Sequence, residues 1–237
     1  MCDTCGCSDD TGVRITDSSH TVLLEQDVLA KNDELASHVR EHLRSHDVFA
    51  VNLMSSPGAG KTTLLERTIR DLDLPFAVVE GDQETLLDAE RIKATGAPVV
   101  QINTGAGCHL DASMLHRALH TLSPQRGSVL FVENVGNLVC PALFDLGETA
   151  RVVILSVTEG PGKPLKYPHM FSATDLVVLN KIDLLPYVDF DVAEFTRDTR
   201  RVNPEARILE LSATRGDGLS DWYAWIQTRC AAAATTT

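Results

Sequence analysis

VFAVNLMSSPGAGKTT, residues 48–63, is the stretch that decides the fold of this chain. An apolar run, which predicts a buried strand, leads into a glycine-rich loop, and a helical pattern then continues to about Asp71. Glycines let the backbone approach phosphate oxygens, and successive N–H groups at a helix N-terminus supply partial positive charge. The order strand, glycine-rich loop, Gly-Lys-Thr and helix therefore predicts a phosphate-binding P-loop.

Within this loop, Lys61 is expected to reach the β- and γ-phosphates of a nucleotide and to act in catalysis, and the Thr62 hydroxyl is expected to bind Mg²⁺. The usual pattern opens with glycine, whereas this chain has Ser55, which we treat as a minor departure. The residues expected to contact the nucleotide here are Ser56, Pro57, Gly58, Ala59, Gly60, Lys61, Thr62 and Thr63.

Six further apolar runs follow the first one, Val48–Met54, and helical or polar stretches separate them. These runs are Phe76–Glu80, Val99–Asn103, Val129–Glu133, Val152–Val157, Leu176–Leu179 and Ile208–Leu211. They are continuous rather than alternating, as expected for parallel strands that are covered on both faces. The pattern predicts an α/β fold of the P-loop NTPase type, with a doubly wound, mostly parallel sheet of about seven strands and helices on both faces.

The predicted domain organisation has four parts. Residues 1–19 form a flexible N-terminal metal-binding arm, 20–46 a leading helix, 47–230 a GTPase domain and 231–237 a disordered tail. The helix is predicted from an apolar stripe formed by Leu35, Val39 and Leu43.

The sequence Asn180-Lys181-Ile182-Asp183 at the end of a predicted strand indicates which base the nucleotide carries. A carboxylate at Asp183 can accept two hydrogen bonds from guanine, whereas adenine would present an acceptor to it. Asn180 is expected to bond the other edge of the base and Lys181 to pack over the ring, and the Ser212-Ala213 pair to place a backbone N–H near the guanine oxygen. These residues predict GTP; a small-molecule kinase or ATP-dependent ligase is the alternative.

Acidic residues at two other strand ends are candidates for Mg²⁺ binding. Glu133 can hold the ion, directly or through water, and Gly136 can meet the γ-phosphate. Asp82 is the candidate for a catalytic carboxylate that positions Mg²⁺ or the attacking water, although it could also be a solvated loop acid. Asp88 and Arg91 could equally form a structural pair.

Cys2, Cys5 and Cys7 are spaced C-x-x-C-x-C. Three thiolates so close together can wrap one soft or borderline metal ion, with the α-amino group as a possible fourth ligand. A second candidate metal site comprises Cys108, His109 and Cys140, which follow two strand ends. Because Cys140 lies beyond Gly136, nucleotide state and metal geometry should be coupled.

Other histidines favour a plainer interpretation. His38, His42 and His46 recur at i, i+4 and i+8 on the leading helix, which more often marks a polar helix face than a metal site. His116 and His120 have the same interpretation, and His169 has no assigned role.

Composition narrows the class of partner. The chain has 237 residues, 43% of them hydrophobic, and a formal net charge of -12. An acidic protein repels phosphate backbones, so nucleic acid is not an expected partner. Its apolar runs are too short to span a membrane, and its start has no secretory pattern. We therefore expect a cytoplasmic protein with reduced thiols.

The motifs together resemble the HypB-type hydrogenase nickel-incorporation GTPases. The resemblance covers Val48 to Ile226 and the arm, and ENVGNLVCP with NTGAGCH is its most specific part. The other motifs that carry it are C-x-x-C-G-C, SSPGAGKTT, EGDQET, TEG…KPLKYPHMF, NKIDLLP and SATRGDG.

This resemblance implies a tight nickel site at Cys2, Cys5 and Cys7, and a weaker nickel or zinc site at Cys108, His109 and Cys140. It also implies a GTP-dependent homodimer that works beside a HypA-type metallochaperone and delivers nickel to the [NiFe]-hydrogenase large subunit. Lys163 and Lys166 would lie near the switch region. The chain has no long histidine-rich run, so bulk nickel storage is not expected.

The combined prediction is a slow, switch-like GTPase that couples GTP binding and hydrolysis to nickel delivery. One alternative is a nickel GTPase of the urease-accessory type, which shares the fold. Another is a metal-buffering protein with a vestigial nucleotide site, against which Lys61, Thr62 and Asp183 count.

Overall fold

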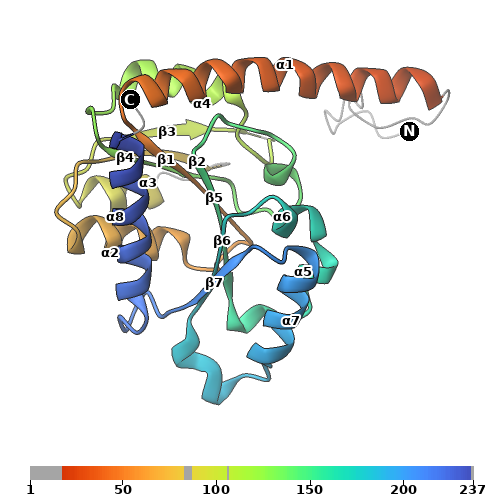
Figure 1. The fold of residues 1–237 in the computed structure, drawn as a ribbon, viewed down its shortest axis with the longest axis vertical. Helices are drawn as coiled ribbons and strands as arrows, with labels where there is room; N and C mark the ends of the chain where they lie inside the picture. Colours follow the sequence, from red (N-terminus) through yellow and green to blue (C-terminus); the bar gives the residue numbers. More distant parts are fainter. Residues whose placement is uncertain (1–17, 83–86, 106, 236–237) are drawn as a thin grey trace, which may run out of the picture.

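A single seven-stranded sheet organises the chain, and every strand pairing in it is parallel (Figure 1). The computed structural model describes residues 18–82, 87–105 and 107–235. The strand order is β3-β2-β4-β1-β5-β6-β7, so all seven predicted strands are present. Their bounds are β1 (Phe49–Ser55), β2 (Phe76–Asp82), β3 (Val99–Asn103), β4 (Val129–Glu133), β5 (Ala150–Ser156), β6 (Leu176–Asn180) and β7 (Arg207–Glu210).

Helices connect the strands and cover both faces of the sheet (Figure 1). They are α1 (Ser18–Ser45), α2 (Lys61–Asp71), α3 (Leu87–Lys93), α4 (Ala112–Leu122), α5 (Lys163–Lys166), α6 (Pro168–Ser172), α7 (Val192–Val202) and α8 (Leu219–Thr235). Three short 3-10 turns lie in the connections: η1 (Cys140–Ala142), η2 (Val157–Glu159) and η3 (Ile182–Tyr187).

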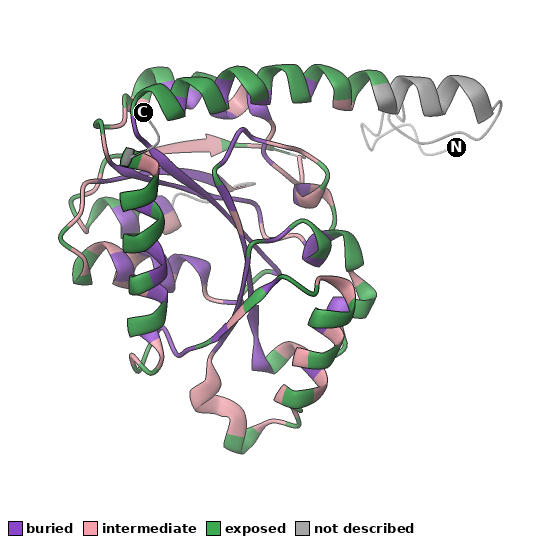
Figure 2. Ribbon diagram, in the orientation of Figure 1, coloured by how far each residue is buried: buried purple, intermediate pink, exposed green. Residues whose placement is uncertain are grey.

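Successive side chains of one strand point to different layers, which is why the strand sequences are continuously apolar. Phe49 and Val51 of β1 belong to a core with α2 and α8, whereas Ala50 belongs to a core with α1 and α4. A third core packs β5 and β6 against α6 and α7. In Figure 2 the inner strands of the sheet are buried, whereas the edge strands β3 and β7 are partly exposed.

The ends of the predicted domains need correction. The first helix starts at Ser18, two residues inside the predicted arm, and α8 continues to Thr235, past the predicted domain end at residue 230. Alanine is the best helix former, so the four alanines after Cys230 extend α8. Among the helices of the described ranges, none is long and apolar enough to cross a membrane.

The apolar stripe of α1 is also shifted from its predicted position. Val39 and Leu43 are buried as expected, but Leu35 is 37% exposed, and Ala36 and Asn32 take the inward positions instead. This arrangement follows the i, i+3, i+4 spacing of a helix face. It places a buried amide, Asn32, in the layer between α1 and the sheet.

Candidate nucleotide and metal site

A cleft of about 500 Å³ opens at the carboxyl edge of the sheet. It lies where β1 has β4 on one side and β5 on the other, so that connections on the two sides of β1 diverge. Ligands of doubly wound sheets bind at such a point. The predicted P-loop, the ends of β2 and β4, and Lys181 line this cleft.

The P-loop has the backbone that phosphate binding requires. Gly60 caps α2 with φ of 99°, in the left-handed region that favours glycine. Lys61 begins α2, and its side chain is buried. Its ammonium donates a hydrogen bond to the Ser55 hydroxyl over 2.8 Å. Ser55, the residue that departs from the usual pattern, therefore holds the lysine expected to bind phosphate, a contact that the sequence pattern does not reveal.

Two buried glutamates stand beside Thr62. The Thr62 hydroxyl donates to Glu133 Oε1 over 2.7 Å, while Glu133 Oε2 and Glu80 Oε2 have no hydrogen-bond partner within the described ranges. Burial raises the pKa of Glu133, and burial followed by the charges of Glu133 and Asp82 raises the pKa of Glu80 to about 8. Unpartnered buried carboxylate oxygens are costly, and a hard cation such as Mg²⁺ would satisfy them.

The residues therefore fit a Mg²⁺ ion. Thr62, Glu133 and Asp82 are the predicted ligands, and all three line the cleft. Glu80 also lines the cleft, although the sequence pattern does not single it out as a ligand. Its position at the end of a buried strand, two residues before Asp82, was the available signal.

Arg91 also reaches the edge of the cleft. It pairs with Asp88 at 3.4 Å, as the structural alternative anticipated, and with Glu66 of α2 at 2.8 Å. These ion pairs tie α3 to α2 beside the phosphate site.

The predicted base-reading residues interlock with the P-loop. Asn180 donates to the Ala59 carbonyl over 2.9 Å and accepts from the backbone N–H of Ala213 over 3.1 Å. Lys181 donates to the Gly58 carbonyl over 2.7 Å. Asn180 thus connects the end of β6 with the P-loop and with the loop that follows β7. Asp183 lies in η3, half-buried, and Ser212 accepts a hydrogen bond from the backbone N–H of Arg215.

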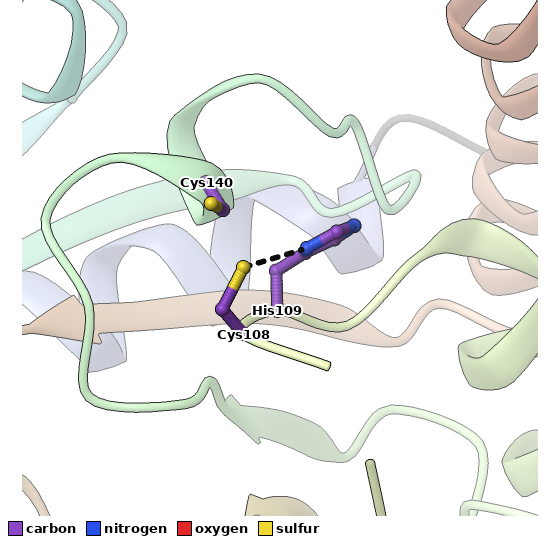
Figure 3. Close-up of side chains that lie close together, drawn as sticks. All are labelled: Cys108, His109 and Cys140. Atoms are coloured by element: carbon purple, nitrogen blue, oxygen red, sulfur yellow. Dashed lines mark hydrogen bonds between the residues drawn. The ribbon is translucent and has the colours of Figure 1, made fainter. Parts of the chain in front are cut away.

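Cys108, His109 and Cys140 converge as predicted (Figure 3). One ligand atom from each lies within 4.8 Å of the others, and Cys108 Sγ lies 3.6 Å from His109 Nδ1. A hydrogen bond with Cys140, then burial, raises the pKa of the Cys108 thiol. The His109 ring stacks on Phe144 at 3.9 Å between centroids. Two sulfurs and one imidazole nitrogen form a donor set suited to nickel or zinc.

The segment from Glu133 to Cys140 connects the cleft with this metal site. Near its start, Asn134 accepts hydrogen bonds from the backbone N–H groups of Leu110 and Val135. Farther on, Asn137 donates to the Cys108 carbonyl over 3.4 Å. A Cβ atom added to Gly136 would lie 3.1 Å from Pro57 Cα, so this segment passes directly over the P-loop.

Asn32 of α1 forms hydrogen bonds with the ends of both segments that carry the candidate metal ligands. Its side chain accepts from the backbone N–H of Ala112 over 3.0 Å and donates to the carbonyl of Asp145 over 2.8 Å. Ala112 follows the Cys-His pair, and Asp145 follows Cys140. The leading helix therefore belongs to the frame of the metal site, which helical periodicity alone did not indicate.

The remaining predicted residues lie elsewhere. Cys2, Cys5 and Cys7 fall outside the described residues. Lys163 pairs with Glu159 at 3.6 Å, and Glu159 also accepts a hydrogen bond from Ser56 of the P-loop. Lys166 lies over the Tyr167 ring.

A P-loop, buried carboxylates beside its threonine and a base-reading loop define a nucleotide-binding P-loop protein. The family model described as "CobW/HypB/UreG, nucleotide-binding domain" matches residues 49–210. The chain belongs to this family, and within it to the HypB proteins.

Individual HypB proteins resemble the chain over most of its length. It is 56% identical over 211 residues to the hydrogenase maturation factor HypB of Azotobacter chroococcum mcd 1, which covers 88% of this chain and 69% of that protein. It is 40% identical over 209 residues to the hydrogenase/urease maturation factor HypB of Helicobacter pylori strain 26695, with 86% of each chain covered. The crystal structure of HypB from Helicobacter pylori in complex with nickel matches with a TM-score of 0.80 and 39% identity, covering 84% of this chain and 95% of that one.

Proposed function

We propose that this chain is a GTP-hydrolysing nickel metallochaperone that couples GTP binding and hydrolysis to nickel delivery during [NiFe]-hydrogenase maturation. The observation that carries the proposal is the shared segment from Glu133 to Cys140. Its first residue bonds Thr62 of the P-loop, and its last residue faces Cys108 and His109. A change at the phosphate end therefore has a short covalent route to the metal ligands.

In the nucleotide reaction, water attacks the γ-phosphorus of GTP and GDP leaves with the β–γ bridging oxygen. Lys61 would hold the β- and γ-phosphates, for which it would exchange its bond to Ser55. Thr62, Glu133 and Asp82 would hold Mg²⁺, which neutralises charge on the phosphate oxygens. Asp82 would also orient the attacking water. Without an arginine supplied by a partner, hydrolysis would be slow, as expected of a switch.

Base selection would rest on Asp183, whose carboxylate accepts hydrogen bonds from guanine. Asn180 would hold the other edge of the base, and the Lys181 stem would pack on its ring. Since Asn180 and Lys181 already bond the P-loop backbone, the base and phosphate contacts are aligned with each other.

Nickel is the cargo of this cycle. Cys108, His109 and Cys140 would bind it in the GTPase domain, with zinc as a competing ion, and Cys2, Cys5 and Cys7 would form the tight site in the arm. Binding requires deprotonated thiols, so Cys108 and Cys140 would each release a proton when the metal binds. When GTP occupies the P-loop, the γ-phosphate would displace the Gly136 segment, and Cys140 would shift relative to Cys108 and His109.

Partners follow from the same proposal. GTP would stabilise a homodimer, a HypA-type metallochaperone would exchange nickel with the chain, and the hydrogenase large subunit would receive it. The Helicobacter pylori relative is a hydrogenase/urease maturation factor, which favours a second candidate function, nickel delivery to urease as well. Nucleic acid has no place in either function.

The test is a nickel titration of the reduced full-length chain with GDP and with a non-hydrolysable GTP analogue. Cys2, Cys5 and Cys7 are replaced by serine so that the GTPase-domain site is observed alone. We expect a nucleotide-dependent affinity that Cys108→Ala removes. Cys230→Ala, a buried cysteine far from the cleft, is the matched control. Superimposable curves with the two nucleotides would refute the coupling.

A further inference from the structure

Two pairs of histidines from distant parts of the sequence come together where α1 packs on α4. His42 lies in the last turn of α1 and His46 lies in the turn directly after that helix, whereas His116 and His120 lie one turn apart on α4. The two helices pack through a shared apolar core that includes Leu43 of α1. Each pair taken alone was interpreted as a polar helix face, whereas the fold joins the two pairs.

The rings of each pair lie close together. The ring centroids are 4.5 Å apart for His42 and His46, and 4.7 Å apart for His116 and His120. His42, His46 and His120 line one groove of about 200 Å³, next to Leu43 and Leu119. Histidines at i and i+4 on one helix face are a recurrent metal-chelating arrangement.

The His46 ring is already held in the form that a metal requires. Its Nδ1 lies 2.8 Å from the backbone oxygen of His42. A carbonyl oxygen can only accept a hydrogen bond, so Nδ1 carries the proton and Nε2 keeps its lone pair. Metal-binding histidines usually donate their second N–H in this way, which fixes the ring orientation.

The four rings also influence one another across the helix boundary. Burial, then the charges of His46, His120 and His116, lower the pKa of His42. If the four imidazoles were protonated, their positive charges would repel one another across the boundary between the helices. Neutral imidazoles that share one cation would turn this repulsion into attraction.

We propose that His42, His46, His116 and His120 form a binding site for one borderline divalent transition-metal ion, such as Zn²⁺ or Ni²⁺, at the α1–α4 boundary. Imidazole nitrogens suit these ions. The site is separate from the Cys108, His109 and Cys140 site, which precedes the other end of α4, and it does not depend on the proposed function.

The four imidazole rings have to change rotamer before one nitrogen of each can reach the same ion. Within the described ranges, Cys108, His109 and Cys140 form the one group of three or more such ligands already within 4.8 Å of one another. All four histidines of the helix boundary are exposed, so their rotamers can change without disturbing the core. The apolar contacts beneath them keep the two helix backbones in register.

The test is a Zn²⁺ titration of the full-length chain in which Cys2, Cys5, Cys7, Cys108 and Cys140 are all replaced by serine. This background should retain one equivalent of bound Zn²⁺. Adding His42→Ala and His120→Ala, one change on each helix, should remove that equivalent. The matched control, His38→Ala with His169→Ala, also removes two exposed histidines and should leave the stoichiometry unchanged.

The same stoichiometry in both double variants, whether retained or lost, would overturn the proposal. A second measurement avoids any dependence on the folding of these variants. In the unsubstituted chain, Zn²⁺ should protect His42, His46, His116 and His120 from modification by diethyl pyrocarbonate more than it protects His38. Mass spectrometry measures the modification of each residue. Equal modification of all five residues with and without Zn²⁺ would contradict the site.

Discussion

The side-chain oxygen of Asn134 accepts a hydrogen bond from the backbone N–H of Leu110 over 3.1 Å. Asn134 follows the Mg²⁺ candidate Glu133, and Leu110 follows the candidate metal ligand His109. Asn134 is buried and also donates to Asn52 Oδ1. One amide thus fixes the distance between the end of β4 and the segment that carries Cys108 and His109.

Replacing Asn134 with alanine should reduce the effect of the bound nucleotide on nickel affinity. The backbone N–H of Leu110 would lose its partner in a buried place, at a cost of about 1–3 kcal/mol in the free energy of unfolding. Nickel affinity should then differ less between the GDP and GTP-analogue states. Asn203→Ala, which removes amide bonds to Phe171 and Thr174, should destabilise the fold and keep the nucleotide dependence intact. Equal effects of both variants on that dependence would contradict the role of Asn134.

A methyl group at position 136 should push the Glu133–Cys140 segment off the P-loop. The new Cβ of Gly136→Ala would lie 3.1–3.2 Å from backbone and side-chain atoms of Pro57. Because overpacking of this kind costs about 1–3 kcal/mol, we expect roughly tenfold weaker binding of a GTP analogue, measured with a fluorescent nucleotide, and a smaller loss for GDP. Gly162→Ala is the matched control, because its Cβ would meet nothing within 4 Å. Unchanged binding of the analogue would show that the segment yields freely.

The stability of the metal-free, nucleotide-free chain should depend on Glu80. Its pKa is raised from 4.5 to about 8 in the folded chain, so between these pH values the folded state binds more protons than the unfolded state. The free energy of unfolding should therefore fall as the pH rises from about 5 to about 8, by up to about 1.4 kcal/mol per pH unit.

Urea denaturation in the presence of EDTA measures this dependence. Glu80→Gln should be more stable than the native chain, by a margin that grows toward pH 8. The corresponding change at the exposed Glu90 should leave the slope unaltered. A constant margin across this range would mean that Glu80 is ionised in the folded chain.

Removing the ring of Phe144 should weaken metal binding without removing a ligand. Phe144 stacks on His109 and restricts its orientation. We expect Phe144→Ala to lower Zn²⁺ affinity at the Cys108, His109 and Cys140 site by roughly 10–100-fold, the usual effect of losing a group that orients a ligand. The measurement is competition with a chromophoric chelator in a chain lacking the arm cysteines. Leu143→Ala, at the exposed neighbouring residue, should have little effect.

Asp183→Asn should change which base the chain accepts. An amide offers a donor where xanthine has a carbonyl and guanine has an amino group. GTP binding should fall by about 10³-fold or more while XTP binding improves, as judged by competition against labelled nucleotide. Asp189→Asn, an exposed aspartate in the same connection, should keep the preference for GTP. An unchanged GTP preference in Asp183→Asn would remove Asp183 from base recognition.

The sequence predicted the sheet well because buried parallel strands leave continuous apolar runs, and every one of the seven is present. It also predicted the convergence of Cys108, His109 and Cys140, since each follows a strand end and parallel strands end at one edge. Glu80 was missed because a glutamate inside an apolar run does not reveal that its carboxylate will face a second one.

Contacts between distant segments were harder to predict. Asn32, on a helix that precedes the P-loop domain, reaches both metal-binding segments only because α1 lies across them. The same packing joins His42 and His46 to His116 and His120. Helical periodicity places each pair on a face, but it does not say which helix that face will meet. Such partnerships depend on the path of α1 over the sheet.

The central position of β1 divides recognition between two halves of the sheet. On one side, β4, β2 and β3 lead to the buried carboxylates and to the candidate metal ligands Cys108 and Cys140. On the other side, β5, β6 and β7 lead to the loops proposed to contact the base. The P-loop follows β1 and therefore lies between these two halves. The base preference should therefore be exchangeable without altering the half of the sheet that carries the candidate metal ligands. An engineered form that uses XTP could then be activated in a cell separately from copies of the protein that use GTP.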